Sequence, residues 1–280
     1  MKKTLRNSLI KLVTPFILLV VLCFQYTDAG DGYLSTALLK LLPILWLILC
    51  LKVNNINIIN NSKHYYNYYY TKRIGWALVA SLAGDLCLVW PENYWCLTSG
   101  ILCFSVGHLY YIWALGFEPM GLQIFLSYFL PLIVANAIVL SFSLKGPLLI
   151  LVLVYTLLIM TMLWRSLVLY QHNRLHRHRH QSNHLMASCV LTGALLFTLS
   201  DACLSLELFQ APDLLTPRNY RLIVLTTYYL AQLLFTVSTL LVSQSGNGGG
   251  GGSGSGGLVV STYPNRVIPR LFNKNKNKKY

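Results

Sequence analysis

Eight long apolar runs divide the chain, and each is long enough to cross a lipid bilayer. A helix rises about 1.5 Å per residue and needs about 20 mostly apolar residues to span the hydrocarbon core. Within that core every backbone amide needs a partner in the protein, so these runs are predicted to be helices. They cover residues 10–26, 35–53, 74–91, 94–115, 122–143, 147–170, 185–209 and 221–243. The predicted fold class is therefore all-α: a polytopic membrane protein with about eight transmembrane helices.

Composition agrees with this fold class. The chain is 55% hydrophobic and only 11% charged, with a mean hydropathy of +0.54. A soluble domain carries about 25% charged residues. The net charge of +14 would suit a nucleic-acid partner, but the basic residues lie in short loops and tails between the apolar runs. The positive-inside rule accounts for that placement, so the lipid bilayer is the expected partner and nucleic acid is not.

The charge distribution also predicts an orientation. With eight spans and a cytoplasmic N-terminus, seventeen Lys and Arg residues fall on the cytoplasmic side and three on the other. Lys145, Arg218 and Arg221 are those three. This bias predicts a multi-pass protein with both termini in the cytoplasm. The first run could instead be a signal peptide, because basic residues precede it and Thr27-Asp28-Ala29 could precede a cleavage site.

Two aspartates interrupt the apolar runs in similar local sequence. Asp85 lies in Gly84-Asp85-Leu86-Cys87-Leu88 and Asp201 in Ser200-Asp201-Ala202-Cys203-Leu204. An ionisable residue at membrane depth costs at least about 2.5 kcal/mol to insert and usually faces a polar interior, a partner or a substrate. The similarity also predicts two four-helix repeats related by an axis along the membrane normal, which would bring the aspartates together. Chance similarity between apolar segments is the alternative.

Other polar side chains are predicted to share the site. Counting helical rise from the non-cytoplasmic boundary places four residues at similar depth, with His108 deeper. Those four are Lys40, Asp85, Asp201 and Tyr228. Tyr111 and Gln232 lie near enough in sequence to support them. Each of these residues could instead have a purely structural role. A lysine can extend to the lipid head groups, and an aspartate can form an internal ion pair. The remaining side chains can form hydrogen bonds between helices or pack there.

The chemistry open to two such carboxyls is acid–base catalysis, with one protonated and the other ionised. The chain has no GxSxG or HExxH motif and no phosphate-binding glycine loop, so a serine or zinc hydrolase is poorly supported. The seven cysteines form no CxxC motif and predict no metal site. Five histidines between Tyr170 and His184 could bind a metal on a helix, but a solvated basic loop is the stronger interpretation.

The C-terminal part has a different composition. The transmembrane domain is predicted to cover residues 1–243, a Gly/Ser-rich linker residues 244–257, and a basic cytoplasmic tail residues 258–280. Lys276 and Lys278 stand at positions typical of the dilysine signal that returns membrane proteins to the endoplasmic reticulum. That compartment is the predicted location. The sequence does not indicate an oligomeric state.

Four segments of the chain resemble the lysoplasmalogenase family, the YhhN and transmembrane protein 86 group. They read SLAGDLCL at 81–88, GILCFSVGHLYY at 100–111, GALLFTLSD at 193–201 and TYYLAQ at 227–232. Lys40 with Pro43 is also similar to the family pattern. The similarity extends over residues ~35–243, in the family's order and spacing. The histidine-rich loop, the linker and the tail lie outside it.

The resemblance implies an enzyme that hydrolyses the vinyl ether bond of lysoplasmalogens, with ethanolamine or choline head groups. The products would be a fatty aldehyde and a glycerophospho-ethanolamine or -choline. The family's two functional aspartates would be Asp85 and Asp201, and no metal or other cofactor is implied. A single-chain ether phospholipid as substrate would explain a site inside the bilayer. A proton-coupled transporter is the alternative, since parallel repeats with intramembrane carboxylates also suit one.

The orientation can be tested with tags at the two termini. Both tags should be accessible to antibody in cells whose plasma membrane alone is permeabilised, because the basic residues favour that side. Protection of the C-terminal tag would contradict an even number of spans and remove the basis for a cytoplasmic retrieval signal.

Overall fold

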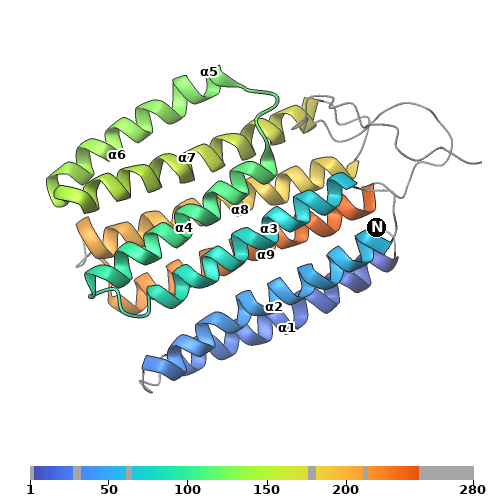
Figure 1. Ribbon diagram of the computed structural model, residues 1–280, viewed down its shortest axis with the longest axis horizontal. Helices are drawn as coiled ribbons and strands as arrows, with labels where there is room; N and C mark the ends of the chain where they lie inside the picture. The colour runs from blue at the N-terminus through green and yellow to red at the C-terminus, as the bar shows by residue number, and fades with distance from the viewer. Residues whose placement is uncertain (1–2, 28–32, 61–64, 176–180, 211–213, 246–280) are drawn as a thin grey trace, which may run out of the picture.

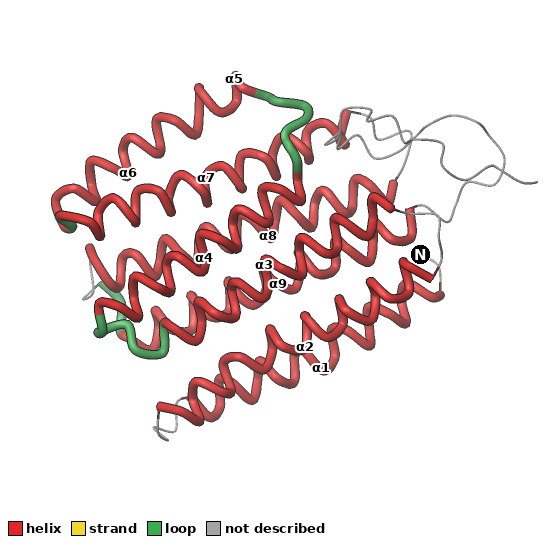
Figure 2. The backbone as a smooth tube through the Cα atoms, viewed as in Figure 1, coloured by secondary structure: helices red, strands yellow, loops and turns green. Residues whose placement is uncertain are grey.

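The computed structural model describes residues 3–27, 33–60, 65–175, 181–210 and 214–245. Six of its rods are single helices: α1 Lys3–Thr27, α2 Tyr33–Asn60, α3 Tyr65–Cys87, α4 Tyr94–Leu115, α7 Gly146–Leu175 and α9 Pro217–Ser245. Two rods are composite: α5 Leu122–Ile124, η1 Phe125–Phe129 and α6 Leu130–Ser143 form one, and α8 Gln181–Ser205 and η2 Leu206–Gln210 form the other. Throughout the described residues there are only helices and loops (Figure 2). The all-α prediction is confirmed.

The helices correspond closely to the predicted spans. Among the described residues, six segments are long and apolar enough to cross a membrane. They are Leu5–Gln25, Tyr94–Leu115, Leu122–Ser143, Gly146–Leu175, Asn183–Phe209 and Pro217–Ser243. The helices α2 and α3 are not among these six; three charged residues, Lys72, Arg73 and Asp85, lie within α3. A polytopic membrane protein is thus confirmed, while the count of eight spans is not.

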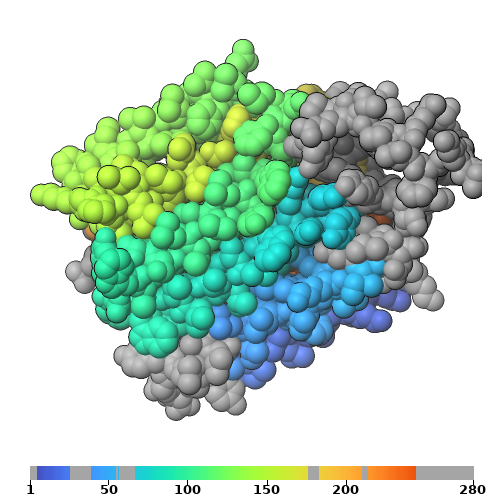
Figure 3. All heavy atoms as spheres, viewed as in Figure 1, coloured from blue at the N-terminus to red at the C-terminus, as the bar shows by residue number. Residues whose placement is uncertain are grey.

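The rods run antiparallel in one bundle (Figure 1). The first helix begins and the last one ends at the same end of the bundle, which suits termini on one side of a membrane. Large apolar side chains are exposed along the outside, among them Leu18, Leu49, Trp113, Phe142 and Ile150. The face in Figure 3 is formed by neighbouring bands from α2, α3, α4, α7 and α6. Such an apolar exterior suits hydrocarbon rather than water.

Two glycines let neighbouring helices approach closely. A Cβ atom at Gly107 of α4 would lie 3.3 Å from the carbonyl oxygen of Ala77 on α3. A Cβ atom at Gly193 of α8 would lie 3.2 Å from the carbonyl oxygen of Ala231 on α9. In lipid, small residues at helix interfaces increase van der Waals contact between backbones. The pairs α3–α4 and α8–α9 carry the two aspartates, so this close packing also positions the site. The prediction of two four-helix repeats stays a prediction.

A buried arginine organises the loop after α4. Arg165 of α7 is only 1% exposed, and its guanidinium donates to the carbonyl oxygens of Gly116 at 2.6 Å and Pro119 at 2.7 Å. Trp164 donates its indole N–H to the carbonyl oxygen of Gly121. Loop carbonyls that would otherwise lack donors at membrane depth are thereby satisfied.

Several predicted features lie outside the described residues. These are His176, His178 and His180 of the histidine-rich loop, linker residues 246–257, and the whole tail 258–280 with Lys276 and Lys278. Residues 244 and 245, assigned to the linker, form the end of α9.

Substituting Gly193 tests the close packing. Gly193→Ala should lower the melting temperature in detergent, because the new methyl group would push against a backbone carbonyl that cannot rotate away; overpacking of this kind costs about 1–3 kcal/mol. Gly75→Ala is the matched control, since a Cβ there would meet only a methyl carbon of Leu51 at 4.0 Å. Equal melting temperatures for the two variants would contradict the packing argument.

Candidate active site

Asp85 lies in the last turn of α3 and is held by a tyrosine from α9. The hydroxyl of Tyr228 donates to Asp85 Oδ2 at 2.7 Å. Gly84 makes room beside the aspartate: a Cβ at this position would lie 2.6 Å from the ring of Phe104 on α4. A larger residue would therefore push α4 away from the carboxyl group.

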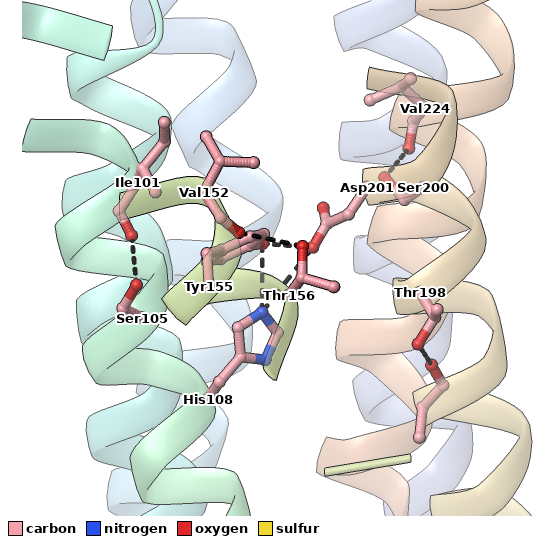
Figure 4. Close-up of polar contacts among 11 residues, drawn as sticks. Ile101, Ser105, His108, Val152, Tyr155, Thr156, Thr198, Ser200, Asp201 and Val224 are labelled. Atoms are coloured by element: carbon pink, nitrogen blue, oxygen red, sulfur yellow. Dashed lines mark hydrogen bonds and ion pairs between the residues drawn. The ribbon is translucent and has the colours of Figure 1, made fainter. Parts of the chain in front are cut away.

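Asp201 lies on α8 and is held by a tyrosine from α7. The hydroxyl of Tyr155 donates to Asp201 Oδ2. His108 of α4 reaches the same point, with its Nε2 3.1 Å from the Tyr155 oxygen and 3.7 Å from Asp201 Oδ2 (Figure 4). Because Tyr155 gives its only proton to Asp201, its oxygen accepts from His108, which places a proton on Nε2. Three helices thus converge on one carboxylate.

Helix α9 is hydrogen-bonded to two other helices beside the site. Ser200, the preceding residue, donates its hydroxyl to the carbonyl oxygen of Val224 at 3.0 Å (Figure 4). On the other side of the bundle, the Tyr229 hydroxyl donates to the backbone oxygen of Lys40 at 2.8 Å. Helix α9 therefore contacts both α8 and α2 beside the site and supplies Tyr228 between them.

The two aspartates line a single cavity of about 650 Å³. Lys40, Tyr155 and Tyr228 line it as well, so side chains from α2, α3, α7, α8 and α9 meet there. Much of the remaining wall is apolar, including Leu88, Val89, Leu97, Ile101, Ile159 and Met160. A pocket of this size with a few polar groups in an apolar wall suits a small amphiphilic ligand.

An aromatic cluster packs beneath the cavity. The ring of Phe197, 1% exposed, lies 5.5 Å from that of Tyr228, 4.8 Å from His108 and 6.2 Å from Tyr111, measured between centroids. Edge-to-face contacts at such distances favour one arrangement of rings. The cluster therefore holds the hydroxyl of Tyr228 and the imidazole of His108 in fixed positions.

The structure brings most of the predicted site residues together. Lys40, Asp85, Asp201 and Tyr228 line the cavity, and His108 reaches Asp201 from below. Tyr111 and Gln232 do not line it. Both are fully buried, and the Tyr111 hydroxyl donates to Gln232 Oε1. This contact suits a supporting role between α4 and α9.

Among the cavity residues that the sequence analysis does not assign to the site are Tyr155, Glu207 and Arg221. The sequence does contain a signal for Tyr155. Like the two aspartates, it is a polar residue in the middle of a mostly apolar run. Arg221 was counted as a loop charge, and Glu207 was not assigned to the site. Both lie at the ends of predicted spans, where a charge has an ordinary interfacial explanation.

Among the residues that the structure describes, no three or more His, Cys, Asp or Glu side chains gather closely enough to hold a metal ion. The described cysteines, all seven of them, are free thiols.

Comparison with known proteins identifies the family. The profile of the YhhN family matches residues 35–239, which include both aspartates and all the helices around the cavity from α2 onward. The chain belongs to the YhhN family. No solved structure matches it.

Named relatives extend the family match over most of the chain. "Lysoplasmalogenase TMEM86B" of Homo sapiens is 32% identical over 237 residues, covering 84% of this chain and 89% of the relative. The Sus scrofa protein of the same name is 34% identical over 209 residues, covering 75% and 76%. "Lysoplasmalogenase TMEM86A" of Bos taurus is 31% identical over 231 residues, covering 81% and 88%. These YhhN relatives carry an enzyme's name, so the comparisons give the transporter alternative no support.

Replacing Tyr111 tests its supporting role. Tyr111→Phe should destabilise the protein by about 1–3 kcal/mol, because it leaves the buried amide of Gln232 without its hydrogen-bond donor. Thermal unfolding in detergent measures the change. Tyr111→Phe combined with Gln232→Leu should recover most of the loss, since replacing both partners by apolar groups is nearly neutral. A stable single variant with a raised substrate KM would instead indicate direct contact with substrate.

Proposed function

We propose that this protein hydrolyses the vinyl ether bond of lysoplasmalogens, releasing a fatty aldehyde and glycerophosphoethanolamine or glycerophosphocholine. Two observations support this: the named relatives are lysoplasmalogenases, and the two aspartates from α3 and α8 line the same apolar-walled cavity. The shared cavity carries the proposal, because acid–base cleavage needs both carboxyl groups within reach of one substrate.

The substrate's shape suits the cavity. A lysoplasmalogen has one alkenyl chain, a glycerol unit and a zwitterionic head group. The apolar wall can accept the proximal part of the chain while the polar groups meet the head group. Entry from the bilayer keeps the chain in hydrocarbon throughout.

Each step of the cleavage has a group available. A protonated carboxyl transfers its proton to the β-carbon of the vinyl ether, leaving an oxocarbenium ion that the second, ionised carboxylate stabilises. That carboxylate then takes a proton from water as the water oxygen bonds to the cationic carbon, giving a hemiacetal. The hemiacetal collapses to aldehyde and a free glycerol hydroxyl as the first carboxylate takes the hemiacetal O–H proton and the second, now protonated, carboxyl gives its proton to the leaving glycerol oxygen. One water is consumed, and both carboxyls return to their starting states.

The hydrogen bonds support an assignment of the two roles. Asp201 accepts from Tyr155 and lies near the imidazole Nε2–H of His108, both of which stabilise negative charge. Among the described residues, the one side-chain hydrogen bond to Asp85 comes from Tyr228. We therefore assign Asp201 as the ionised carboxylate and Asp85 as the proton donor. Lys40, Tyr228 and the buried Tyr111–Gln232 pair position these groups or the substrate.

The predicted location is part of this proposal. Lys276 and Lys278 favour retrieval to the endoplasmic reticulum, which requires that the tail face the cytoplasm. With an even number of spans and the predicted charge bias, the N-terminus would face the cytoplasm as well. The enzyme would then meet its substrate in the membrane of that compartment.

Asparagine substitutions test the catalytic pair. Asp85→Asn and Asp201→Asn keep size but remove the titrating proton, so each should lower kcat by at least about 10²-fold. The double variant should be little worse than either single variant, because residues that act as one unit are not additive. Aldehyde release from purified protein in detergent, without any ion gradient, is the measurement. Near wild-type rates in both single variants would rule out this mechanism.

The isotope effect and one further variant separate the roles. If carbon protonation is the slow step, wild-type kcat should fall about two-fold or more in heavy water.

Tyr155→Phe should lower kcat and shift the pH profile, whereas Tyr170→Phe, outside the cavity, is the matched control. An unchanged profile in Tyr155→Phe would remove Tyr155 from the mechanism.

A further inference from the structure

Four charged side chains line the cavity in addition to the aspartates. Lys40 comes from α2, Glu207 from η2 and Arg221 from the second turn of α9. Lys40 and Glu207 are half-buried, as both aspartates are, and Arg221 is exposed. The exposed Glu92, in the loop between α3 and α4, lines the same cavity. The two exposed residues, Arg221 and Glu92, therefore mark the part of the cavity wall that is open to the outside.

The two cations repel each other across this space. Lys40 and Arg221 are close enough to interact electrostatically, and both also interact with the carboxylate of Glu207. In an apolar surrounding, like charges that face one cavity favour an anion placed between them. Two cations together with the carboxylates of Glu92 and Glu207 match a ligand that carries a phosphate and an ammonium group better than a ligand with phosphate alone.

The spacing along α9 fits the same ligand. Arg221 precedes Tyr228 by seven residues, which is about 10 Å along the helix axis, and Tyr228 holds Asp85. In a lysoplasmalogen the glycerol unit separates the vinyl ether from the phosphate. With the vinyl ether beside Asp85, the phosphate would thus lie toward Arg221 and the alkenyl chain along the apolar wall.

We infer that Lys40 and Arg221 bind the phosphate of a zwitterionic lysophospholipid and that Glu207 accepts its ammonium group. The inference takes its substrate class from the proposed function. The subsite acts by holding the head group so that the vinyl ether lies between the two aspartates. A primary ammonium donates hydrogen bonds to a carboxylate and a quaternary one cannot, so the subsite favours ethanolamine over choline.

Binding of a substrate analogue that cannot be cleaved tests the subsite. The probe is a saturated 1-O-alkyl lysophosphoethanolamine, compared with the 1-O-alkylglycerol that lacks the phosphate. Purified full-length protein in a neutral detergent should bind the phosphorylated probe at least about 10-fold more tightly, the range expected for hydrogen bonds to charged groups. Equal affinity of wild-type protein for both probes would overturn the inference, whatever the behaviour of any variant.

Charge-removing variants locate the phosphate contact. Arg221→Gln and Lys40→Met should each weaken binding of the phosphorylated probe about 10-fold and leave binding of the alkylglycerol unchanged. Arg218→Gln and Lys145→Met are the matched controls, since both residues are exposed and neither lines the cavity. Arg221→Lys should retain most of the affinity. Equal weakening for both probes would instead indicate a structural role and overturn the inference.

Glu207→Gln tests the ammonium contact. Wild-type protein should prefer the ethanolamine probe to its choline counterpart, and the variant should lose that preference. A preference that persists in Glu207→Gln would remove Glu207 from the subsite.

These measurements are independent of turnover. Phosphate-dependent binding without aldehyde release would leave the subsite standing and reject the proposed function. Aldehyde release with no phosphate dependence of binding would do the opposite.

Discussion

The structure depends on one constraint: a polar group inside hydrocarbon needs a partner within the protein. Long apolar helices satisfy their own backbones, and their outer side chains can face lipid. The remaining polar side chains then have to meet one another inside the bundle. Asp85 meets Tyr228, Asp201 meets Tyr155 and His108, and Arg165 meets loop carbonyls. The same requirement that shapes the fold therefore concentrates the reactive groups.

The aspartates are held by residues from distant parts of the chain. Tyr228 of α9 bonds Asp85 of α3, and His108 of α4 approaches Asp201 of α8. Each carboxyl is thus positioned by a helix of the other half of the bundle. Close packing at Gly107 and Gly193 sets the helix spacing on which these contacts depend. Catalytic geometry and helix packing cannot be separated here, because a small shift of either pair would break a hydrogen bond to a carboxyl.

The cavity suits an amphiphilic ligand in which an apolar chain, a reactive bond and a polar head group follow one another. Apolar side chains form much of the wall, and the two carboxyls share the cavity with Lys40, Glu207 and Arg221. A single-chain phospholipid presents a chain, an ether and a zwitterionic head group in that order. Under the proposed function, these charged side chains orient the molecule and the half-buried carboxyls act on it. Binding energy from the head group then aligns the reacting carbon.

The sequence by itself determined the all-α membrane fold, because apolar runs of this length have no other stable form in lipid. It also marked Asp85, Asp201, Lys40, His108 and Tyr228, because a polar residue at membrane depth is costly enough to need a role. It did not determine which side chains these residues contact in the folded protein. Tyr155 and Arg221 join the site, while Tyr111 and Gln232 pair with each other away from the cavity. Periodicity shows that a residue lies in a helix, but only the packing of α2, α4, α7 and α9 around the aspartates decides which side chains face the same space.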